Sequence, residues 1–226
     1  MSKKYQNNKG LTSIWILGGG NFGQKSLASL KIKHPKAVIT VIEKEKNKSI
    51  SLKTDHVNVI ESDGICYLDR YMTKTNPDII VPAIPVHVAY EWTRKKLTPK
   101  FNIKPTSIPD MLLDELPNPI IGPVGMAYAS ISDFMCPDNC PEPAEICIVT
   151  KKPRIYLLFQ KLKCLNVGSF KSFVIQSEQL APGVGGYSPK ALFNLLSAIK
   201  KSSSPVLLST ACSCHGVINA FKFIRK

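Results

Sequence analysis

The chain lacks the sequence features of a membrane-spanning or secreted protein. No apolar run in its 226 residues approaches the roughly 18 residues that a membrane-spanning helix needs. Residues 1–9 are polar, and no apolar core of a secretion signal follows them. We therefore expect a cytoplasmic protein with no membrane insertion.

Acidic and aromatic residues are also scarce. The chain has 16 Asp and Glu against 30 Lys and Arg, a formal net charge of +14, and only 8% aromatic residues. Such a charge could attract nucleic acid. However, the lysines are scattered, few aromatic residues lie between them, and no nucleic-acid motif is recognisable. We therefore predict a lysine-rich solvated surface and no nucleic-acid partner.

The strongest pattern is a glycine motif near the N-terminus. The apolar residues 14–17 predict a buried parallel strand, and Gly18-x-Gly20-x-x-Gly23 leads from it into a helix. Gly18 would permit the tight turn, Gly20 would let the backbone approach a pyrophosphate, and Gly23 would let the helix pack closely. The sequence thus predicts a dinucleotide site that includes Gly18, Gly20, Asn21, Phe22 and Gly23. The alternative is a flexible glycine loop without a ligand.

An acidic residue follows at the spacing that this motif requires. Residues 37–42 predict a second strand that ends at Glu43, about 20 residues after Gly23, where a carboxylate can accept hydrogen bonds from the adenosine ribose. Glu43 therefore favours NAD(H). Lys44 and Lys46 could accommodate a 2′-phosphate, so NADP is the alternative. Glu43 could also be a solvated residue at a strand end.

Strands and helices continue to alternate after Glu43. The sequence predicts strands over 57–60 and 79–84 and helices over 65–73 and 86–96, which calls for a parallel sheet with a crevice at the carboxyl ends of its strands. Asp63 and His87 would lie at that crevice. His87 could act as an acid or base, but a lone histidine is more often structural. No catalytic residue is assigned.

Residues 13 to about 96 resemble the RCK or TrkA-N domain, the NAD-binding Rossmann domain of potassium-transport regulators. The resemblance rests on Gly18 to Gly23, on Glu43 and on the turn Ser62-Asp63-Gly64. It implies that Glu43 holds the adenosine ribose and that Asp63 approaches the adenine. It also implies a transporter as partner. The rest of the chain does not look like the ligand-binding domain of that family.

Prolines between residues 97 and 119 predict a connector around a short helix at 109–116 and a boundary between domains 1–98 and 99–226. The predicted fold is α/β, with a Rossmann-like parallel sheet followed by a smaller, cysteine-rich α/β half. For that half the sequence predicts strands over 120–124, 171–175 and 206–209, a loop over 183–187, a helix over 189–201 capped by Ser188, and a last helix over 216–223.

The second half carries two groups of cysteines. Cys136-x3-Cys140-x6-Cys147 lies in a proline-rich loop, and Cys212-Ser213-Cys214-His215 is predicted at the start of the last helix, where a helix N-terminus would stabilise thiolates. The three loop cysteines with Cys212 or Cys214 would suit a [4Fe–4S] cluster or zinc. We favour iron–sulfur because C-x2-C knuckles are absent. The alternative is a set of packed thiols, as expected for Cys66 and Cys164.

These features together predict an NAD(H)-binding protein that couples a Rossmann nucleotide site to a cysteine-ligated metal or iron–sulfur centre and acts as a regulator or redox sensor. One alternative is an NAD(P)H-dependent oxidoreductase that uses the centre for electron transfer. Another is a TrkA-like regulatory subunit of potassium uptake. The expected partners are the nucleotide and a redox or transporter protein, and a homodimer is compatible with the sequence.

Overall fold

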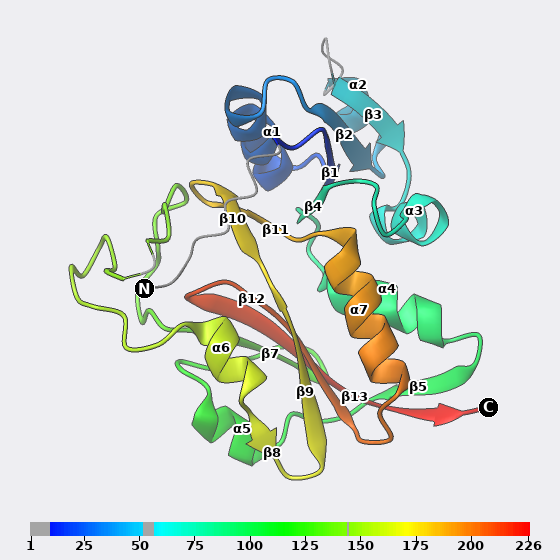
Figure 1. Ribbon diagram of the computed structural model, residues 1–226, viewed down its shortest axis with the longest axis vertical. Coiled ribbons are helices and arrows are strands. Elements are labelled where there is room, and N and C mark those ends of the chain that lie inside the picture. The colour runs from blue at the N-terminus through cyan, green and yellow to red at the C-terminus, as the bar shows by residue number, and fades with distance from the viewer. Residues whose placement is uncertain (1–9, 52–56, 144) are drawn as a thin grey trace.

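The computed structural model describes residues 10–51, 57–143 and 145–226, which form two large β-sheets with helices on both faces of each and a separate two-stranded sheet (Figure 1). The polar residues 1–9 lie outside the described residues. The four-stranded sheet A contains β1 (Ser13–Leu17), β2 (Val38–Glu43), β3 (Val57–Glu61) and β4 (Ile79–Pro82). All its pairs are parallel and its order is β3-β2-β1-β4, which confirms the α/β prediction.

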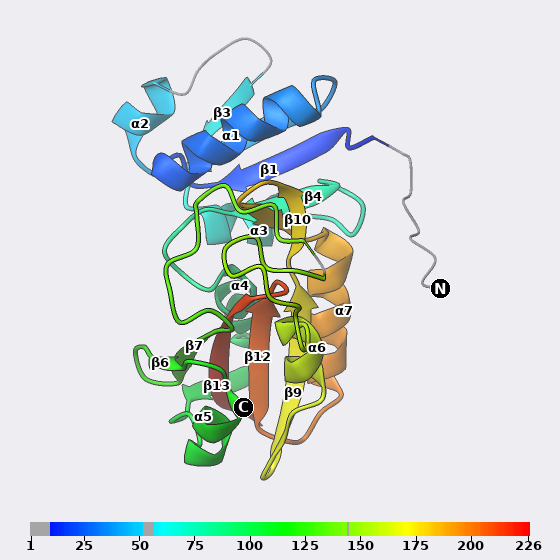
Figure 2. The same ribbon diagram turned by 90° about the vertical axis from the view of Figure 1, so that its left-hand side faces the viewer.

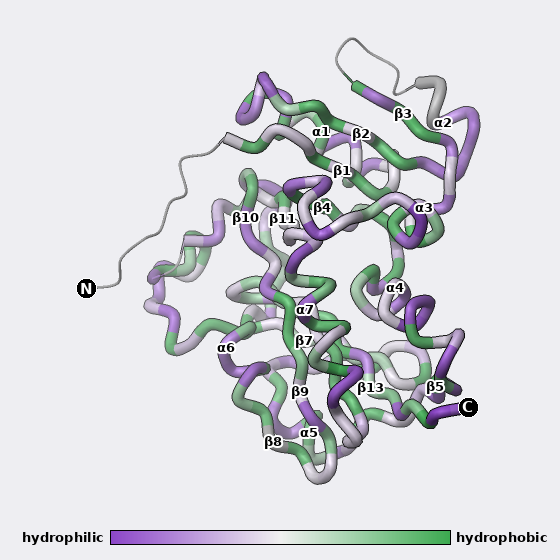
Figure 3. The backbone as a smooth tube through the Cα atoms, turned by 45° about the vertical axis from the view of Figure 1, so that its right-hand side comes forward, coloured by the Kyte–Doolittle hydropathy of each residue, from purple (hydrophilic) through white to green (hydrophobic). Residues whose placement is uncertain are grey.

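Strands β1, β2 and β4 of sheet A are buried on both faces because they are mainly apolar, as Figure 3 shows for β1 and β2, whereas the edge strand β3 is partly exposed to solvent. Helix α1 (Asn21–Lys33) covers one face with Leu27 and Leu30. Helix α3 (Gly64–Tyr71) lies on the other, and α4 (Val88–Leu97) packs against α3. The structure also has a short helix α2 (Lys46–Ser51) that the sequence analysis did not predict.

The seven-stranded sheet B is formed by the second half of the chain. Strand β13 (His215–Arg225) is at its centre: β12 (Val206–Ala211) pairs along one edge, and β7 (Met126–Ser130) followed by β5 (Phe101–Pro105) pairs along the other. The sheet is completed by β6 (Ile120–Ile121), β8 (Asn166–Val167) and β9 (Phe170–Gln176). The predicted helix over 216–223 is therefore wrong. A central strand buried on both faces loses its alternating pattern and resembles a buried helix in sequence.

Helices cover both faces of sheet B. Helix α7 (Pro189–Lys200) packs beside α4 on one face, and α5 (Asp110–Glu115) and α6 (Leu158–Lys163) pack on the other. The predicted cap of α7 is confirmed, because the Ser188 hydroxyl accepts a hydrogen bond from the amide of Ala191. The second half has the larger sheet of the two, so the prediction of a smaller half is wrong on this point.

The two sheets are joined by a hairpin of β10 (Glu178–Ala181) and β11 (Val184–Gly186), visible in Figure 2 between α1 and β9. The predicted loop over 183–187 is thus largely a strand. The amides of Ile80 and Tyr187 donate to each other's carbonyls at 2.9 and 3.1 Å. Gly186 is required there, because a Cβ atom would lie 2.7 Å from the Ile80 carbonyl oxygen.

One hydrophobic core crosses the predicted domain boundary at residue 98. Trp92 and Leu97 of α4 belong to the same core as Trp15 of sheet A and Phe173 and Leu196 of the second half. The boundary itself stays a prediction. Among the described residues, no helix is both long enough and apolar enough to cross a membrane.

Candidate dinucleotide and cysteine sites

The three motif glycines have different surroundings. Gly18 has φ +100°, and a Cβ atom there would lie 2.6 Å from the Ala83 carbonyl oxygen. A Cβ atom at Gly23 would lie 2.0 Å from the carbonyl oxygen of Gly18, so the helix can pack this closely only with glycine. At Gly20 a Cβ atom would meet nothing within 4 Å. Gly20 therefore leaves open space in front of α1, where a phosphate would be bound.

Glu43 is buried, with 7% of its surface exposed, and its carboxylate holds the glycine loop. The amide of Gly19 donates to Oε2 at 2.6 Å and that of Glu45 donates to Oε1 at 2.8 Å. Burial alone would raise the pKa of this carboxyl, but the hydrogen bonds from Glu45, Gly19 and Lys44 outweigh it and lower the pKa. Glu43 is thus an ionised acceptor at the loop and not a solvated residue at a strand end.

A cavity of about 870 Å³ opens at the carboxyl edge of sheet A, and Gly18, Glu43 and Asp63 line it. We call it the Glu43 cavity. Asp63 is also the N-cap of α3, where its carboxylate accepts the amide of Cys66 at 2.8 Å; that bond is the main cause of its lowered pKa. The basic side chains Lys44 and Lys95 line the same cavity. The structure therefore brings Glu43 and Asp63 together as predicted for an adenosine site.

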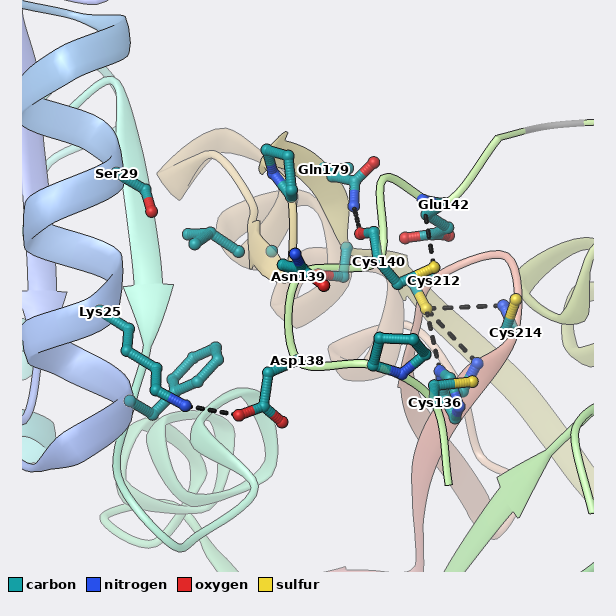
Figure 4. A pocket seen from close by; sticks show the side chains of 18 of the residues that line it. Lys25, Ser29, Cys136, Asp138, Asn139, Cys140, Glu142, Gln179, Cys212 and Cys214 are labelled. Carbon is teal, nitrogen blue, oxygen red and sulfur yellow. Dashed lines mark hydrogen bonds and ion pairs between the residues drawn. The ribbon is translucent and has the colours of Figure 1, made fainter. Parts of the chain in front are cut away.

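A second cavity of about 1000 Å³ lies between the two halves of the chain. Asn21, Phe22 and Lys25 of α1 line one side, and the opposite side is lined by Cys136, Cys140, Cys212 and Cys214. We call it the cysteine cavity. Figure 4 shows Lys25 and Ser29 on α1 facing the loop of Asp138 and Asn139, with the four cysteines gathered beyond that loop. The start of the glycine-motif helix and the cysteines therefore share one space.

Cys212 to Cys214 form the turn of the hairpin between β12 and β13, and His215 is the first residue of β13, so this segment is not the start of a helix. The prediction that a helix N-terminus stabilises these thiolates is therefore wrong. Burial, assisted by the nearby carboxylate of Glu142, instead raises the pKa of Cys212 to about 12. The turn is held in place because the amide of Leu158 donates to the Ser213 carbonyl and that of Ile131 to the Cys214 carbonyl, at 2.9 and 2.8 Å.

Three of the cysteine sulfur atoms accept hydrogen bonds from backbone amides. The Cys212 sulfur accepts the amides of Cys214 and His215 at 3.5 and 3.4 Å. The Cys140 sulfur accepts the amide of Glu142 at 3.4 Å. At Cys147, hydrogen bonds from the amide and hydroxyl of Thr150 and the amide of Val149 lower the pKa. In each case the donors follow the cysteine by two or three residues, so the local turn itself presents N–H groups to the sulfur.

Arg154 connects Cys147 to the cysteine cavity, which Cys147 does not itself line. Its guanidinium donates to the Cys214 sulfur and, through Nε, to the Pro143 carbonyl at 2.7 Å. It also interacts electrostatically with Cys147. Arg154 was not predicted from the sequence, because nothing in its spacing from the cysteines indicates that it contacts Cys214 and interacts with Cys147.

The loop that carries Cys136 and Cys140, which we call the cysteine loop, is attached both to the hairpin of β10 and β11 and to α1. The Cys140 carbonyl accepts hydrogen bonds from the amide of Gly183 at 3.0 Å and from Nε2 of Gln179 at 2.6 Å. Lys25 of α1 forms an ion pair with Asp138, which lies between Cys136 and Cys140. These contacts fix the position of the loop relative to the helix that begins at the glycine motif.

All seven cysteines lie within the described residues and are free thiols. Cys66 and Cys164 are exposed, so the prediction that they are buried is wrong. In the part of the chain that the structure describes, no three His, Cys, Asp or Glu side chains converge closely enough to hold a single metal ion.

His87 is buried and fully hydrogen-bonded. Its Nδ1 lies 2.6 Å from Oδ1 of Asn219 and its Nε2 lies 2.9 Å from the Thr210 hydroxyl. Because the amide oxygen can only accept, Nδ1 carries the proton and Nε2 accepts from Thr210. Burial lowers the pKa of His87 to about 4. Both nitrogens are occupied by residues of sheet B, which indicates a structural role.

Comparison with known proteins gives two matches. A family model described as "AF_1314_C: Uncharacterized protein, C-terminal domain" matches residues 89–224, beginning within α4. A protein of Archaeoglobus fulgidus, described as an uncharacterized protein, is 30% identical over 219 residues, which cover 92% of this chain and 98% of that relative. No solved structure matches the chain.

Proposed function

We propose that this chain, which belongs to the AF_1314_C family, is an NAD(H)-binding regulatory protein whose nucleotide site adjoins a redox-active cysteine site. The observation that carries the proposal is the shared lining of the cysteine cavity, with Asn21 and Phe22 of the glycine-motif helix on one side and four cysteines on the other. A dinucleotide whose pyrophosphate lies at Gly20 would have one end in each of the two cavities.

The Glu43 cavity supports the adenosine end of this arrangement. Glu43 is ionised, is fixed by the Gly19 amide and lines this cavity, where a carboxylate would accept the ribose hydroxyls. Asp63 lines the same space. The nicotinamide end would then lie in the cysteine cavity beside Phe22, whose ring is 43% exposed and available for stacking.

Reduced thiols support the cytoplasmic location that we propose, because that compartment keeps cysteines reduced. In a regulatory protein, binding of NADH or NAD⁺ would shift the position of the cysteine loop through α1. The ion pair between Lys25 and Asp138 connects that loop to the helix. Output to a partner would then depend on the redox state of the nucleotide.

An NAD(P)H-dependent oxidoreductase is the second candidate, and the shared cavity favours it too. NADH would give up two electrons and a proton and become NAD⁺, and an external electron acceptor would be reduced by both electrons through the cysteine-ligated centre that the oxidoreductase hypothesis requires. A regulator would bind NADH without turnover. The role in potassium uptake depends on the resemblance alone, and association with a membrane transporter in a pull-down assay would test it.

The test of nucleotide binding is Gly20→Val, monitored by fluorescence titration with NADH. Because a Cβ atom at Gly20 meets no protein atom, the apo fold should be unchanged, while the branched side chain should occupy the phosphate position and weaken binding at least tenfold. Gly10→Val is the matched control, since Gly10 also faces open space and lies outside the motif. Equal affinities of the Gly20→Val and wild-type proteins would refute the proposed site.

The same titration separates the two candidates when an electron acceptor is added. Sustained NADH oxidation that is lost in Gly20→Val identifies an oxidoreductase. Saturable binding with no oxidation above the rate of the variant identifies a regulator.

A further inference from the structure

We propose that Cys136 is the nucleophilic thiol of a thiol–disulfide exchange site in the cysteine cavity, and that Ser132 and His215 relay protons to and from its sulfur. The substrate class is a small molecule that contains a disulfide bond. This inference deepens the redox-active cysteine site of the proposed function and rests on that part of it alone. It does not require that a dinucleotide binds.

Three side-chain contacts connect the Cys136 sulfur to the Cys212 sulfur. The Ser132 hydroxyl lies 3.2 Å from the Cys136 sulfur and 3.4 Å from Nε2 of His215. Nδ1 of the same imidazole lies 3.9 Å from the Cys212 sulfur. The relay uses the tautomer in which Nδ1–H donates to that sulfur, which leaves Nε2 free to receive the proton of Cys136 through the hydroxyl.

Sheet B positions the two relay residues. His215 is the first residue of β13 and pairs with Ser130, the last residue of β7, so Ser132 follows two residues beyond this pair. The Ser130 hydroxyl donates to the Ser132 carbonyl at 2.7 Å and accepts the Ser132 amide at 3.2 Å. The two hydroxyls lie 3.1 Å apart. Ser132 is thus tied to the end of β7, beside the imidazole, as a preorganised relay requires.

The lining of the cavity identifies Cys136 as the nucleophile. Cys136 and His215 line the cysteine cavity, whereas Ser132 does not, so a bound molecule meets the sulfur and not the hydroxyl. A thiol attacks as its thiolate, and a base within hydrogen-bond reach, directly or through one intermediate group, promotes that form. The contacts of Cys136 provide such a base through a single hydroxyl.

The other thiols of the cavity have different contacts. The sulfurs of Cys140 and Cys212 accept backbone amides, and the buried Cys214 sulfur accepts the guanidinium of Arg154. Burial raises the pKa of Cys212 to about 12, so this residue stays a protonated thiol at neutral pH, although it contacts the imidazole. These three cysteines are therefore weaker nucleophiles than Cys136.

A disulfide is the substrate class that fits this cavity best. Its volume of about 1000 Å³ is sufficient for a small molecule. An acyl substrate would need N–H groups directed at the oxyanion, but the amides of Cys214 and His215 donate to the Cys212 sulfur. Disulfide exchange needs no oxyanion site, and the neighbouring thiols can later attack a mixed disulfide at Cys136 and release it.

The exchange step balances in atoms and electrons. The proton of Cys136 moves through Ser132 to Nε2 of His215, and the thiolate attacks one sulfur of the substrate R–S–S–R. A bond forms between the Cys136 sulfur and that sulfur, the substrate S–S bond breaks, and the leaving R–S⁻ takes the proton from the imidazolium. The Cys136 sulfur is oxidised, and the released thiol R–SH carries the electron pair of the broken bond.

The test is the reaction of the wild-type protein with a substoichiometric amount of dithiobis(2-nitrobenzoate), a small aromatic disulfide. Mass spectrometry of the digested protein locates the modified cysteine. Cys136 should react at least fivefold faster than Cys66 and Cys164, although those two are exposed. A smaller ratio, or faster reaction of Cys140 or Cys212, would overturn the proposal.

Variants of the relay residues test how Cys136 is activated. Ser132→Ala and His215→Gln should each slow its reaction at least fivefold. Ser132→Thr, which keeps the hydroxyl, should react like wild type. Ser29→Ala is the matched control, because Ser29 lines the same cavity from α1 (Figure 4). An unchanged Cys136 rate in either folded Ser132→Ala or folded His215→Gln would refute the relay.

The remaining cysteines report whether each variant is folded. The buried Cys214 should stay the slowest to react, and the exposed Cys66 and Cys164 should keep their wild-type rates. In an unfolded variant Cys214 would lose its protection, and the wild-type comparison of Cys136 with the exposed cysteines then decides the proposal without it.

Because these reactions contain no nucleotide, their outcome is separate from the NADH titration. Fast reaction of Cys136 without NADH binding would leave the exchange site and refute the nucleotide site. NADH binding with a slow Cys136 would do the opposite.

Discussion

The buried imidazole of His87 should make the stability of the protein depend strongly on pH. Its folded-state pKa of about 4 lies below the ordinary histidine value of 6.5, because burial disfavours the charged form. Between these values the unfolded chain binds a proton that the folded chain does not. Stability is therefore fully present above pH 6.5 and is lost as the pH falls toward 4.

The magnitude follows from the difference between the two pKa values. Each pKa unit corresponds to 1.36 kcal/mol, so lowering the pH from 7 to 4 should reduce the free energy of unfolding by about 3 kcal/mol through His87 alone. That is a large part of the ~5–15 kcal/mol of a typical domain. His87 connects α4 to Thr210 of β12 and Asn219 of β13, so the loss should appear where the two halves of the chain meet.

The assay is urea unfolding at pH 7, 5.5 and 4 for wild type and His87→Gln. Glutamine keeps the ability to donate to Asn219 but cannot be protonated, and all other titrating groups cancel in the difference between the two proteins. The stability advantage of wild type over the variant should shrink by about 3 kcal/mol from pH 7 to pH 4. A difference that stays constant with pH would refute the reasoning, since His87 would then titrate equally in both states.

Two further predictions concern the sites themselves. Glu43→Ala should weaken NADH binding by about 10- to 100-fold and NADPH binding less, because the ribose hydroxyls lose a charged acceptor; titrations that show equal losses would remove Glu43 from the ribose site. Gly183→Ala should displace the cysteine loop, since its Cβ would lie 1.7 Å from the Asp138 carbonyl oxygen at a backbone φ of +72°. Cys140 in that variant should be alkylated faster than in wild type, while unchanged reactivity would show that the loop position does not depend on this contact.

The local features of the first half could be predicted from sequence because each depends on short-range rules. A strand before Gly18, a helix after it and an acid at Glu43 are tied together by spacing, and the observed order of sheet A agrees with them. The hydrogen bond that Glu43 accepts from the Gly19 amide could not be predicted from the sequence, because it forms only when the glycine turn is folded.

The second half was harder to predict because its elements are defined by partners distant in sequence. Residues 216–223 contain apolar residues without strict alternation, and only pairing with β12 on one edge and with β7 and β5 on the other makes them a strand. The glycines of residues 183–187 indicate a loop when only the sequence is known. In the structure, Gly183 lies against the Asp138 carbonyl and Gly186 against the Ile80 carbonyl, where a Cβ atom would not fit.

The cysteine spacing predicted that Cys136, Cys140 and Cys147 would meet Cys212 or Cys214. The structure brings Cys136, Cys140, Cys212 and Cys214 to one cavity, which Cys147 does not line. Two features of this site could not be predicted from the sequence. One is that α1 lines the opposite side of the cysteine cavity, which depends on the packing of the β10–β11 hairpin against sheet A. The other is Arg154, whose long side chain bridges segments that no spacing rule connects.

The position of β13 also constrains how the protein is made. Its eleven residues are the shared partner of β5, β7 and β12, all of which precede it in the chain. During translation those strands leave the ribosome with hydrogen-bonding edges unsatisfied, and sheet B can close only after residue 225 has emerged. Sheet A, whose strands all lie within the first 82 residues, has no such delay. Synthesis should therefore complete sheet A while sheet B is still unfinished, and the turn that carries Cys212 and Cys214 can take its folded position only once β13 has emerged.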